Sequence, residues 1–232
     1  MTVLYDKIAT NMHLVLDLPF REGIGVVTRD VSKYHREMTL VNTPTWTTLA
    51  SGKPVLDFDA ASDEYFECDD ALTTELNFTS GDYSIGGWVY YSLGNDNMIL
   101  ARYELDVSGW ELYLYSPNLQ LRHSHAAGAT VRTGVYSGGW TTNTWWFFGV
   151  SRSGATATMV RGTAGRAGVL TSLPVSGDAL IDPETCARDL VSCRFTKDQD
   201  YFNGPRGRLI VADVAFSFAD WNSIFQREKG AY

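Results

Sequence analysis

The stretch Met98–His123 reads MILARYELDVSGWELYLYSPNLQLRH, and its alternation of apolar and polar residues decides the fold class. Turns are predicted at Ser108-Gly109 and at Pro117-Asn118. Alternation with a period of two is typical of strands, and strands joined by such turns predict antiparallel hairpins. The three strands are expected over Met98–Tyr103, Trp110–Tyr115 and Leu119–His123.

The same kind of pattern recurs along the rest of the chain. Trp145–Arg152 (WWFFGVSR) is nearly all apolar, which predicts a central strand buried on both faces. Ser217 can cap a helix in which Phe218, Trp221, Ile224 and Phe225 share one face. Many short strands separated by turns predict an all-β, two-sheet antiparallel sandwich with a short C-terminal helix. The other expected strands are Leu14–Leu18, Met38–Val41, Val55–Phe58, Tyr65–Glu67, Tyr83–Tyr91, Thr130–Thr133, Ala155–Arg161, Leu190–Phe195 and Leu209–Phe216.

Several short motifs follow one another in a set order. They are Asp30-Val31-Ser32, PVLDFD from Pro54, DEYF from Asp63, FTSGDYSIGGWV from Phe78, NTWWFFGV from Asn143 and GRLIVADV from Gly207 followed by FADW from Phe218. In this order they resemble the laminin-G-like and concanavalin A-like jelly-roll domains over about residues 14–226. The resemblance implies a jelly-roll β-sandwich that binds glycans or proteins, often through calcium, on cell surfaces, in secreted enzymes or on phage particles. We expect an N-terminal arm at residues 1–12 and a single laminin-G-like domain at residues 13–232.

Composition excludes several classes of function. The chain has 232 residues, a net charge of −8 and no basic run, which argues against nucleic-acid binding. The N-terminal sequence MTVLYDKIATNMHLVLDL has neither the basic region nor the long apolar core of a secretion signal, and no stretch is long enough for a membrane span. Synthesis in the cytoplasm is therefore expected, with a place on a virion surface or outside the cell only after release.

The three cysteines, Cys68, Cys186 and Cys193, form no CxxC pair. An odd number without that spacing argues against a disulfide framework and against a zinc site. We expect three buried thiols, and a single Cys186–Cys193 bridge stays open as the alternative.

A partial glycosidase motif lies at Glu104-Leu105-Asp106-Val107. Retaining glycosidases need two carboxyl groups about 5–5.5 Å apart, and concanavalin-like glucanases place them on one strand in a pattern such as E-x-D-x-E. Here the acid/base position is taken by Ser108, or by Gly109 if a bulge is allowed, and Glu111 falls in the next strand. Glu104 and Asp106 are therefore only a weak catalytic hypothesis, and an enzyme is not expected.

Binding residues are predicted at two further places. Asp59 and Asp63 flank a short loop and could share a calcium ion with Asp30, since calcium takes six to eight oxygen ligands; a solvated acidic edge is the alternative. No cofactor is required by the sequence. Sugar sites stack rings on exposed aromatic side chains, and the alternative for these residues is ordinary packing. The aromatic candidates for a glycan platform are Trp110, Tyr113, Tyr115, Tyr136 and Trp140.

The leading functional hypothesis is a non-catalytic binding or structural module, of the kind that decorates a phage capsid or forms part of a tail or fibre. It would associate with itself or with other virion proteins. A glycan-binding lectin is the alternative, with a cell-surface glycan as its partner, and a glycoside hydrolase is the third hypothesis. Neither nucleic-acid binding nor membrane insertion is expected.

Overall fold

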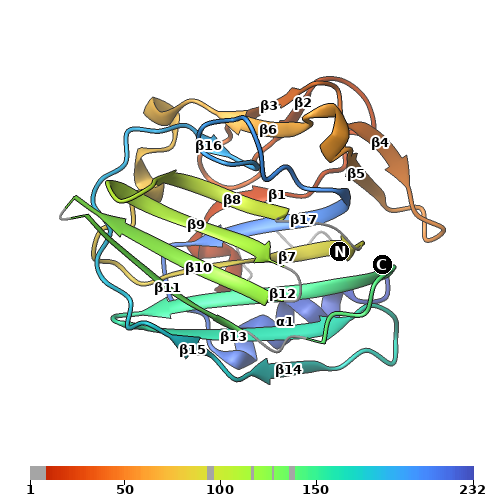
Figure 1. Ribbon diagram of the computed structural model, residues 1–232. Helices are drawn as coiled ribbons and strands as arrows, with labels where there is room; N and C mark the ends of the chain where they lie inside the picture. The colour runs from red at the N-terminus through yellow and green to blue at the C-terminus, as the bar shows by residue number, and fades with distance from the viewer. Residues whose placement is uncertain (1–8, 93–96, 116–117, 127, 136–138) are drawn as a thin grey trace.

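Two antiparallel sheets pack face to face in the computed structural model, which describes residues 9–92, 97–115, 118–126, 128–135 and 139–232 (Figure 1). All strand pairs of the described residues are antiparallel. The predicted all-β, two-sheet jelly-roll sandwich with a short C-terminal helix is confirmed. That helix, α1 (Phe218–Glu228), is 11 residues long, and no helix of the described residues is long and apolar enough to cross a membrane.

One sheet of the described residues has eight strands, in the order β14-β13-β12-β7-β17-β5-β4, with β1 paired to β17. The long strand at its centre, β7, lies between β12 and β17, so both of its edges are hydrogen-bonded. The strands cover β1 Leu14–Leu18, β4 Thr45–Thr48, β5 Pro54–Phe58, β7 Tyr83–Tyr91, β12 Thr144–Ser153, β13 Thr156–Thr163, β14 Leu170–Leu173 and β17 Gly204–Ala212.

The other sheet has nine described strands, in the order β15-β11-β10-β9-β8-β16-β6-β3-β2. The quoted hairpin stretch forms its middle, as β8, β9 and β10. The strands cover β2 Val27–Arg29, β3 Glu37–Val41, β6 Tyr65–Cys68, β8 Asn97–Glu104, β9 Ser108–Tyr115, β10 Asn118–His125, β11 Ala129–Val135, β15 Ser176–Gly177 and β16 Leu190–Val191. Four short 3-10 helices complete the described elements: η2 Ala9–His13, η3 Ala60–Ser62, η4 Asp70–Leu72 and η5 Thr74–Leu76.

Apolar side chains from both sheets meet in one core between the layers. In β9, Trp110, Leu112 and Leu114 belong to this core, whereas Tyr113 packs in a separate cluster on the other face of the sheet. The alternation of apolar and polar residues along β9 thus places Trp110, Leu112 and Leu114 toward the inside of the sandwich and Glu111 and Tyr113 on the outer face. This alternation decides which side chains can reach a ligand.

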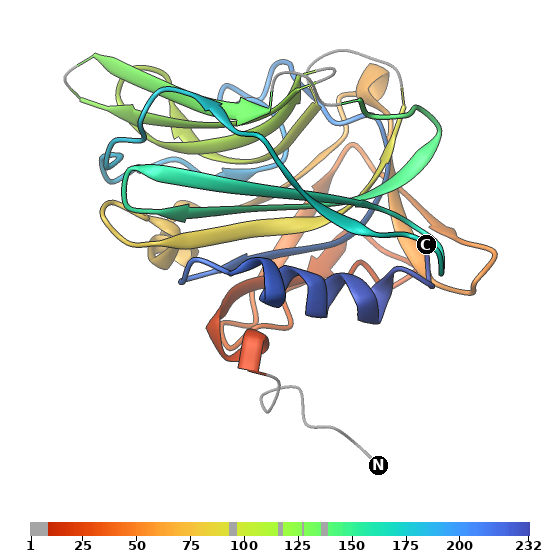
Figure 2. The ribbon, with the colours of Figure 1, turned by 90° about the horizontal axis from the view of Figure 1, so that it is seen from below.

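The eight-stranded sheet is covered on its second face as well. Figure 2 shows α1 lying against the face turned away from the nine-stranded sheet. The ring of Trp221 rests on Gly86 and Gly149, which are directly paired on β7 and β12. A Cβ at either glycine would lie 2.5–2.6 Å from ring atoms of Trp221, closer than any real contact. These two glycines form the floor on which the helix docks.

The C-terminal tail belongs to the same layer. The ring of Tyr232 stacks on Trp88 with centroids 4.4 Å apart, and its hydroxyl accepts a hydrogen bond from the Arg208 amide at 2.9 Å. Glu228 accepts hydrogen bonds from Trp88 Nε1 and from Arg208. The end of the tail is thus packed into its own domain.

Replacing Gly149 by alanine should destabilise the fold without altering its strands. The added methyl group must push against Trp221, and overpacking of a buried contact costs about 1–3 kcal/mol of unfolding free energy. Thermal unfolding followed by circular dichroism measures the loss. Gly81→Ala is the matched control, since its Cβ would meet nothing within 4 Å. Equal melting temperatures for Gly149→Ala and Gly81→Ala would contradict the glycine floor.

Candidate functional site

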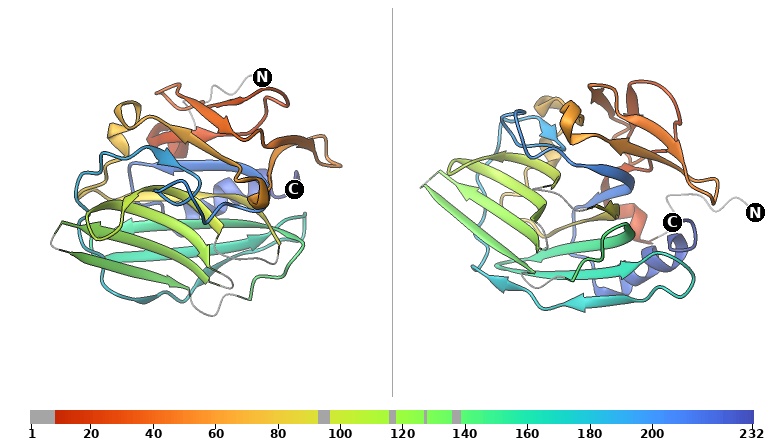
Figure 3. Two further views of the ribbon diagram at one scale, coloured as in Figure 1. Left: turned by 45° about the horizontal axis from the view of Figure 1, so that its top comes forward. Right: turned by 45° about the vertical axis from the view of Figure 1, so that its right-hand side comes forward.

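Two polar hollows of the described surface are candidates for ligand binding. The first, which we call the end cleft, has a volume of about 440 Å³ and lies where β4, β5 and η3 meet the end of β7 and the start of β17. Figure 3 shows the β4–β5 hairpin at this end of the sandwich. The side chains that matter for its chemistry are Asp57, Asp59, Glu64, Tyr90, Ser92 and Asn203.

Three carboxyl groups give the end cleft its charge. Burial raises the pKa of Asp57, and the nearby charge of Asp59 raises it further. Burial also raises the pKa of Glu64, whose carboxylate accepts a hydrogen bond from the Asp59 amide at 2.7 Å. No lysine, arginine or histidine among the described residues forms an ion pair with these three groups. The cleft therefore offers hydrogen-bond acceptors and repels anions.

The opposite wall of the end cleft is held by the backbone of Asn203. Its amide donates to Asn97 Oδ1 at 2.8 Å, and its carbonyl accepts a hydrogen bond from the Ser92 hydroxyl at 3.0 Å. The ring of Tyr90 is half-buried and lies edge-on to Trp145, with centroids 5.7 Å apart. Fixed acceptors, a carboxamide and a phenol thus surround a cleft within the size range of small-ligand sites.

The second hollow, the sheet pocket, lies on the outer face of the nine-stranded sheet and has a volume of about 200 Å³. Its floor is built by Tyr103 of β8, Glu111 of β9 and Arg122 of β10. The register places Arg122 directly opposite Glu111, and their side chains form an ion pair at 2.8 Å. Burial raises the pKa of Glu111 to about 7, although Arg122 opposes that shift.

A loop from the end of β16 covers the sheet pocket and adds Arg194, Phe195, Gln199 and Asp200 to its lining. Lys197 anchors this loop through ion pairs of 2.7 Å to both Glu67 and Asp189. The carbonyl of Asp200 accepts a hydrogen bond from the Met98 amide at 3.1 Å, which ties the loop to β8. The charged groups of the loop are consequently held in place over the sheet.

The catalytic hypothesis for Glu104 and Asp106 does not fit the geometry. Glu104 ends β8 and is bound by Arg188, with Nη2 to Oε1 at 2.5 Å. The hydrogen bond from Arg188 lowers the pKa of Glu104, whereas a general acid needs a raised pKa. Asp106 lies in the hairpin turn with a φ of 56° and accepts a hydrogen bond from Thr130. Both carboxylates therefore make structural contacts around the β8–β9 hairpin.

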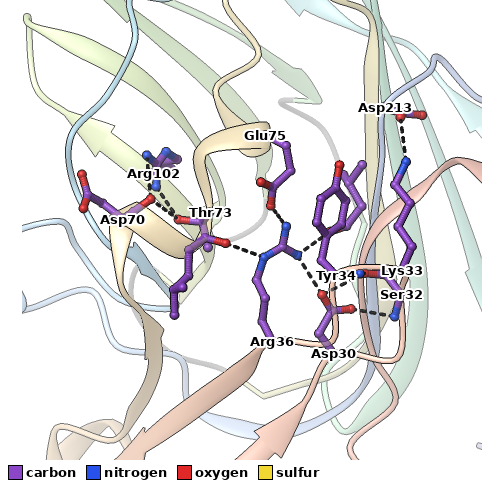
Figure 4. A network of polar contacts seen from close by, with 12 residues as sticks. Asp30, Ser32, Lys33, Tyr34, Arg36, Asp70, Thr73, Glu75, Arg102 and Asp213 are labelled. Atoms are coloured by element: carbon purple, nitrogen blue, oxygen red, sulfur yellow. Dashed lines mark hydrogen bonds and ion pairs between the residues drawn. The ribbon is translucent and has the colours of Figure 1, made fainter.

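The structure contradicts the calcium trio at Asp30. Its side chain is buried and accepts hydrogen bonds from the amide and hydroxyl of Ser32 and from Arg36 at 2.7 Å (Figure 4). The Asp17 amide donates to the same carboxylate. Arg36 also pairs with Glu75. With its oxygens fully used, Asp30 has none left for a metal ion.

Asp59 and Asp63 are left as a pair without Asp30. Asp59 caps η3 by accepting hydrogen bonds from the Ala61 amide and the Ser62 hydroxyl, and Asp63 is exposed with a φ of 55°. Calcium at these two residues stays a prediction. In the part of the chain that is described, three acidic groups come together at Asp69, Asp70 and Asp189 instead, and Asp189 is already paired with Lys197.

The predicted aromatic platform is wrong for the three side chains that can be assessed. Trp110 is 1% exposed and donates from Nε1 to the Leu76 carbonyl; Tyr113 is 4% and Trp140 is 7% exposed. A buried ring has no free face for a sugar. Tyr115 belongs to β9 but its side chain is not described, and Tyr136 lies outside the described residues.

The cysteine prediction is confirmed in its preferred form. Cys68, Cys186 and Cys193 are all buried and none is disulfide-bonded, so the alternative bridge between Cys186 and Cys193 is not formed. Burial raises the pKa of all three thiols, which keeps them protonated and unreactive at neutral pH.

Comparison with known proteins supports the fold. No family model matches the chain, and no curated protein matches it. Among solved structures it is similar to the botulinum neurotoxin serotype G binding domain, with 12% identity, a TM-score of 0.69, and coverage of 93% of this chain and 51% of that one. The serotype D ligand binding domain in complex with N-acetylneuraminic acid gives 14% identity, a TM-score of 0.64, and coverage of 95% and 52%. The chain thus spans about half the length of these structures, and at this identity the likeness shows the fold alone.

Removing the charge of Asp30 tests its structural role. Breaking one partner of a buried ion pair costs about 3–5 kcal/mol, and we expect Asp30→Asn to fall at the lower end because Glu75 still faces Arg36. Chemical denaturation measures the loss, with Asp198→Asn as the control, since Asp198 is exposed and is not among the predicted calcium ligands. The loss should be the same in calcium and in EDTA. If Asp30→Asn lowered the unfolding free energy in calcium but not in EDTA, Asp30 would be a calcium ligand.

Proposed function

We propose that the protein is a non-catalytic glycan-binding module and that the end cleft holds its sugar. The observation that carries this proposal is the set of fixed acceptors without a cationic partner, Asp57, Asp59 and Glu64, facing Tyr90 and Asn203 across one cleft. Sugar hydroxyl groups can donate hydrogen bonds to such carboxylates, and Nδ2 of the Asn203 side chain can donate to a sugar oxygen. Because the cleft is acidic, its ligand is a neutral or amino sugar.

The similar structures support a binding module over an enzyme. Their descriptions name receptor binding domains, and one serotype D ligand binding domain is described in complex with N-acetylneuraminic acid. Those descriptions apply to those proteins, and the low identity carries over no residue. The absence of a raised pKa at Glu104 and its pairing with Arg188 also favour binding over hydrolysis at the hairpin.

Glycan-array binding should depend on Asp57. Asp57→Asn keeps the size of the side chain but replaces one acceptor oxygen by a donor, so we expect at least a tenfold loss of affinity for the bound sugar, roughly the value of one hydrogen bond to a charged group. Calorimetric titration with the array ligand that binds most tightly measures this loss of affinity.

Asp63→Asn is the matched control, because Asp63 is an exposed aspartate near the cleft that does not line it. It should bind like the unmodified protein. If Asp57→Asn and Asp63→Asn bound the sugar with equal affinity, the sugar would not lie in the end cleft. An array with no binding above background at millimolar ligand would contradict the proposal that the protein binds glycans.

We keep one second candidate, association with further copies of this chain, as expected for a virion component. One observation favours it: Ile24 and Val26 are 81% and 56% exposed beside β2, and β2 ends its sheet, with no strand of the described residues on its outer side. Apolar groups beside an open strand edge favour pairing with another chain. The virion setting itself stays a prediction from the sequence.

Light scattering of the purified protein tests the assembly. If copies associate through this edge, the protein scatters as an oligomer and the double variant Ile24→Ser with Val26→Ser scatters as a monomer. Val169→Ser, which removes another apolar side chain that is 67% exposed, should leave the size unchanged. A monomeric unmodified protein at high concentration would rule this candidate out.

A further inference from the structure

We propose that the sheet pocket is a second site, and that it binds the carboxylate of an acidic sugar, such as a uronic acid residue, between Arg122 and Arg194. The site is separate from the end cleft. Along β8, Asn97 accepts a hydrogen bond from Asn203 of the cleft, and Ala101 stands opposite Glu111 of the pocket, four residues or about 13 Å further on. That the ligand is a sugar rests on the proposed glycan-binding function; that it carries a carboxylate rests on the pocket alone.

The guanidinium groups of Arg122 and Arg194 can both bind a ligand, for different reasons. Arg194 forms no ion pair with any described residue, although it lines the pocket with Glu111 and Asp200. Arg122 donates from Nη1 to Glu111, and its Nη2 donates to no described residue. A ligand acceptor can bind this second nitrogen, whereas Nε is too deeply buried for a ligand to reach. Arginine is the side chain best suited to bind carboxylate in two parallel hydrogen bonds.

The rest of the lining favours a sugar acid over a simple anion. Glu111 and Asp200 are carboxyl groups that repel a bare anion but accept hydrogen bonds from hydroxyl groups. Gln199 adds a carboxamide, and the rings of Tyr103 and Phe195 lie edge-on at 5.9 Å as an apolar wall. A ligand that combines one carboxylate with neighbouring hydroxyls matches this mixture of cations, acceptors and apolar surface.

Because of Glu111, ligand binding in the sheet pocket depends on pH. The groups that face it are Arg122, Arg194, Asp200 and Tyr103, and its pKa of about 7 is set mainly by burial. A bound anion disfavours the ionised form of Glu111, so binding takes up a proton and is favoured as the pH falls from 8 to 6. Protonation of Glu111 also frees Arg122 for the ligand.

Calorimetric titration with sodium glucuronate tests the site, with glucose and sodium acetate as the probes that lack the charge or the hydroxyls. We expect glucuronate to bind more tightly than either, with affinity rising from pH 8 to pH 6. Arg194→Gln should weaken glucuronate about ten- to a hundredfold, the range for a hydrogen bond between charged groups. Arg166→Gln, an exposed arginine on the β13–β14 connection, makes the same change in net charge and should have no effect.

Two variants separate this inference from the proposed function. Asp57→Asn alters the end cleft and should leave glucuronate binding intact, while Glu111→Gln should remove its pH dependence. Equal affinities for acetate and glucuronate would show a general anion site and would contradict the preference for an acidic sugar. Loss of glucuronate binding in Arg166→Gln as much as in Arg194→Gln, or no glucuronate binding at all, would overturn the inference, whereas the array result for Asp57→Asn would still decide the end cleft.

Discussion

The contact of Trp221 with Gly86 and Gly149 holds α1 against the eight-stranded sheet and so determines which surfaces of the molecule stay open. Because the two glycines are paired across β7 and β12, the indole ring can lie directly on the sheet, where its Nε1 donates to Ser151. The helix thereby covers part of one face of the eight-stranded sheet, and the other sheet covers the second face. Hollows remain beside the helix, one lined by Ser151, Thr158 and Ser172 and one by Asp17 and Arg208. The end cleft and the sheet pocket lie elsewhere, at the end of the sandwich and on the outer face of the nine-stranded sheet.

Much of this architecture could be predicted from the sequence, because its signals are local. The apolar run of β12 needs two buried faces, and the Ser217 cap with Trp221, Ile224 and Phe225 defines the helix. The differences lie where local sequence signals are weak. None of the expected strands corresponds to the short strands β2, β4, β14 and β15, which exist through pairing with other strands. Leu190–Phe195 was expected as one strand, but it becomes a loop after Val191.

The functional residues were harder to predict, since they depend on the phase and register of strands. Trp110 and Glu111 are neighbours, yet Trp110 points into the core and Glu111 toward the sheet pocket, and composition cannot tell which points where. The observed register pairs Glu111 with Arg122, whereas a hairpin closed by the turn expected at Pro117-Asn118 would pair Glu111 with Ser124. No local pattern could bring in Arg194 or Asp200, which reach the pocket through a loop held by Lys197. Asp30 was misassigned because its partner Arg36 was not considered.

The two hollows differ in charge, and that difference constrains any ligand that uses both. The end cleft has three carboxyl groups and no cation paired to them in the described residues, whereas the sheet pocket has two arginines against Glu111 and Asp200. One segment links them: Arg194 and Asp200 line the pocket, and Asn203 lines the cleft. With a net charge of −8, the protein repels an acidic polymer at long range, so attraction at Arg194 acts only within about a Debye length of 8 Å. If both hollows bind sugars as we propose, a chain of alternating neutral and acidic sugars would fit both, whereas a uniformly acidic chain would be repelled at the cleft. Selectivity between such glycans would then arise from the spacing of charge along the ligand, because two linked contacts strengthen binding only when both are engaged.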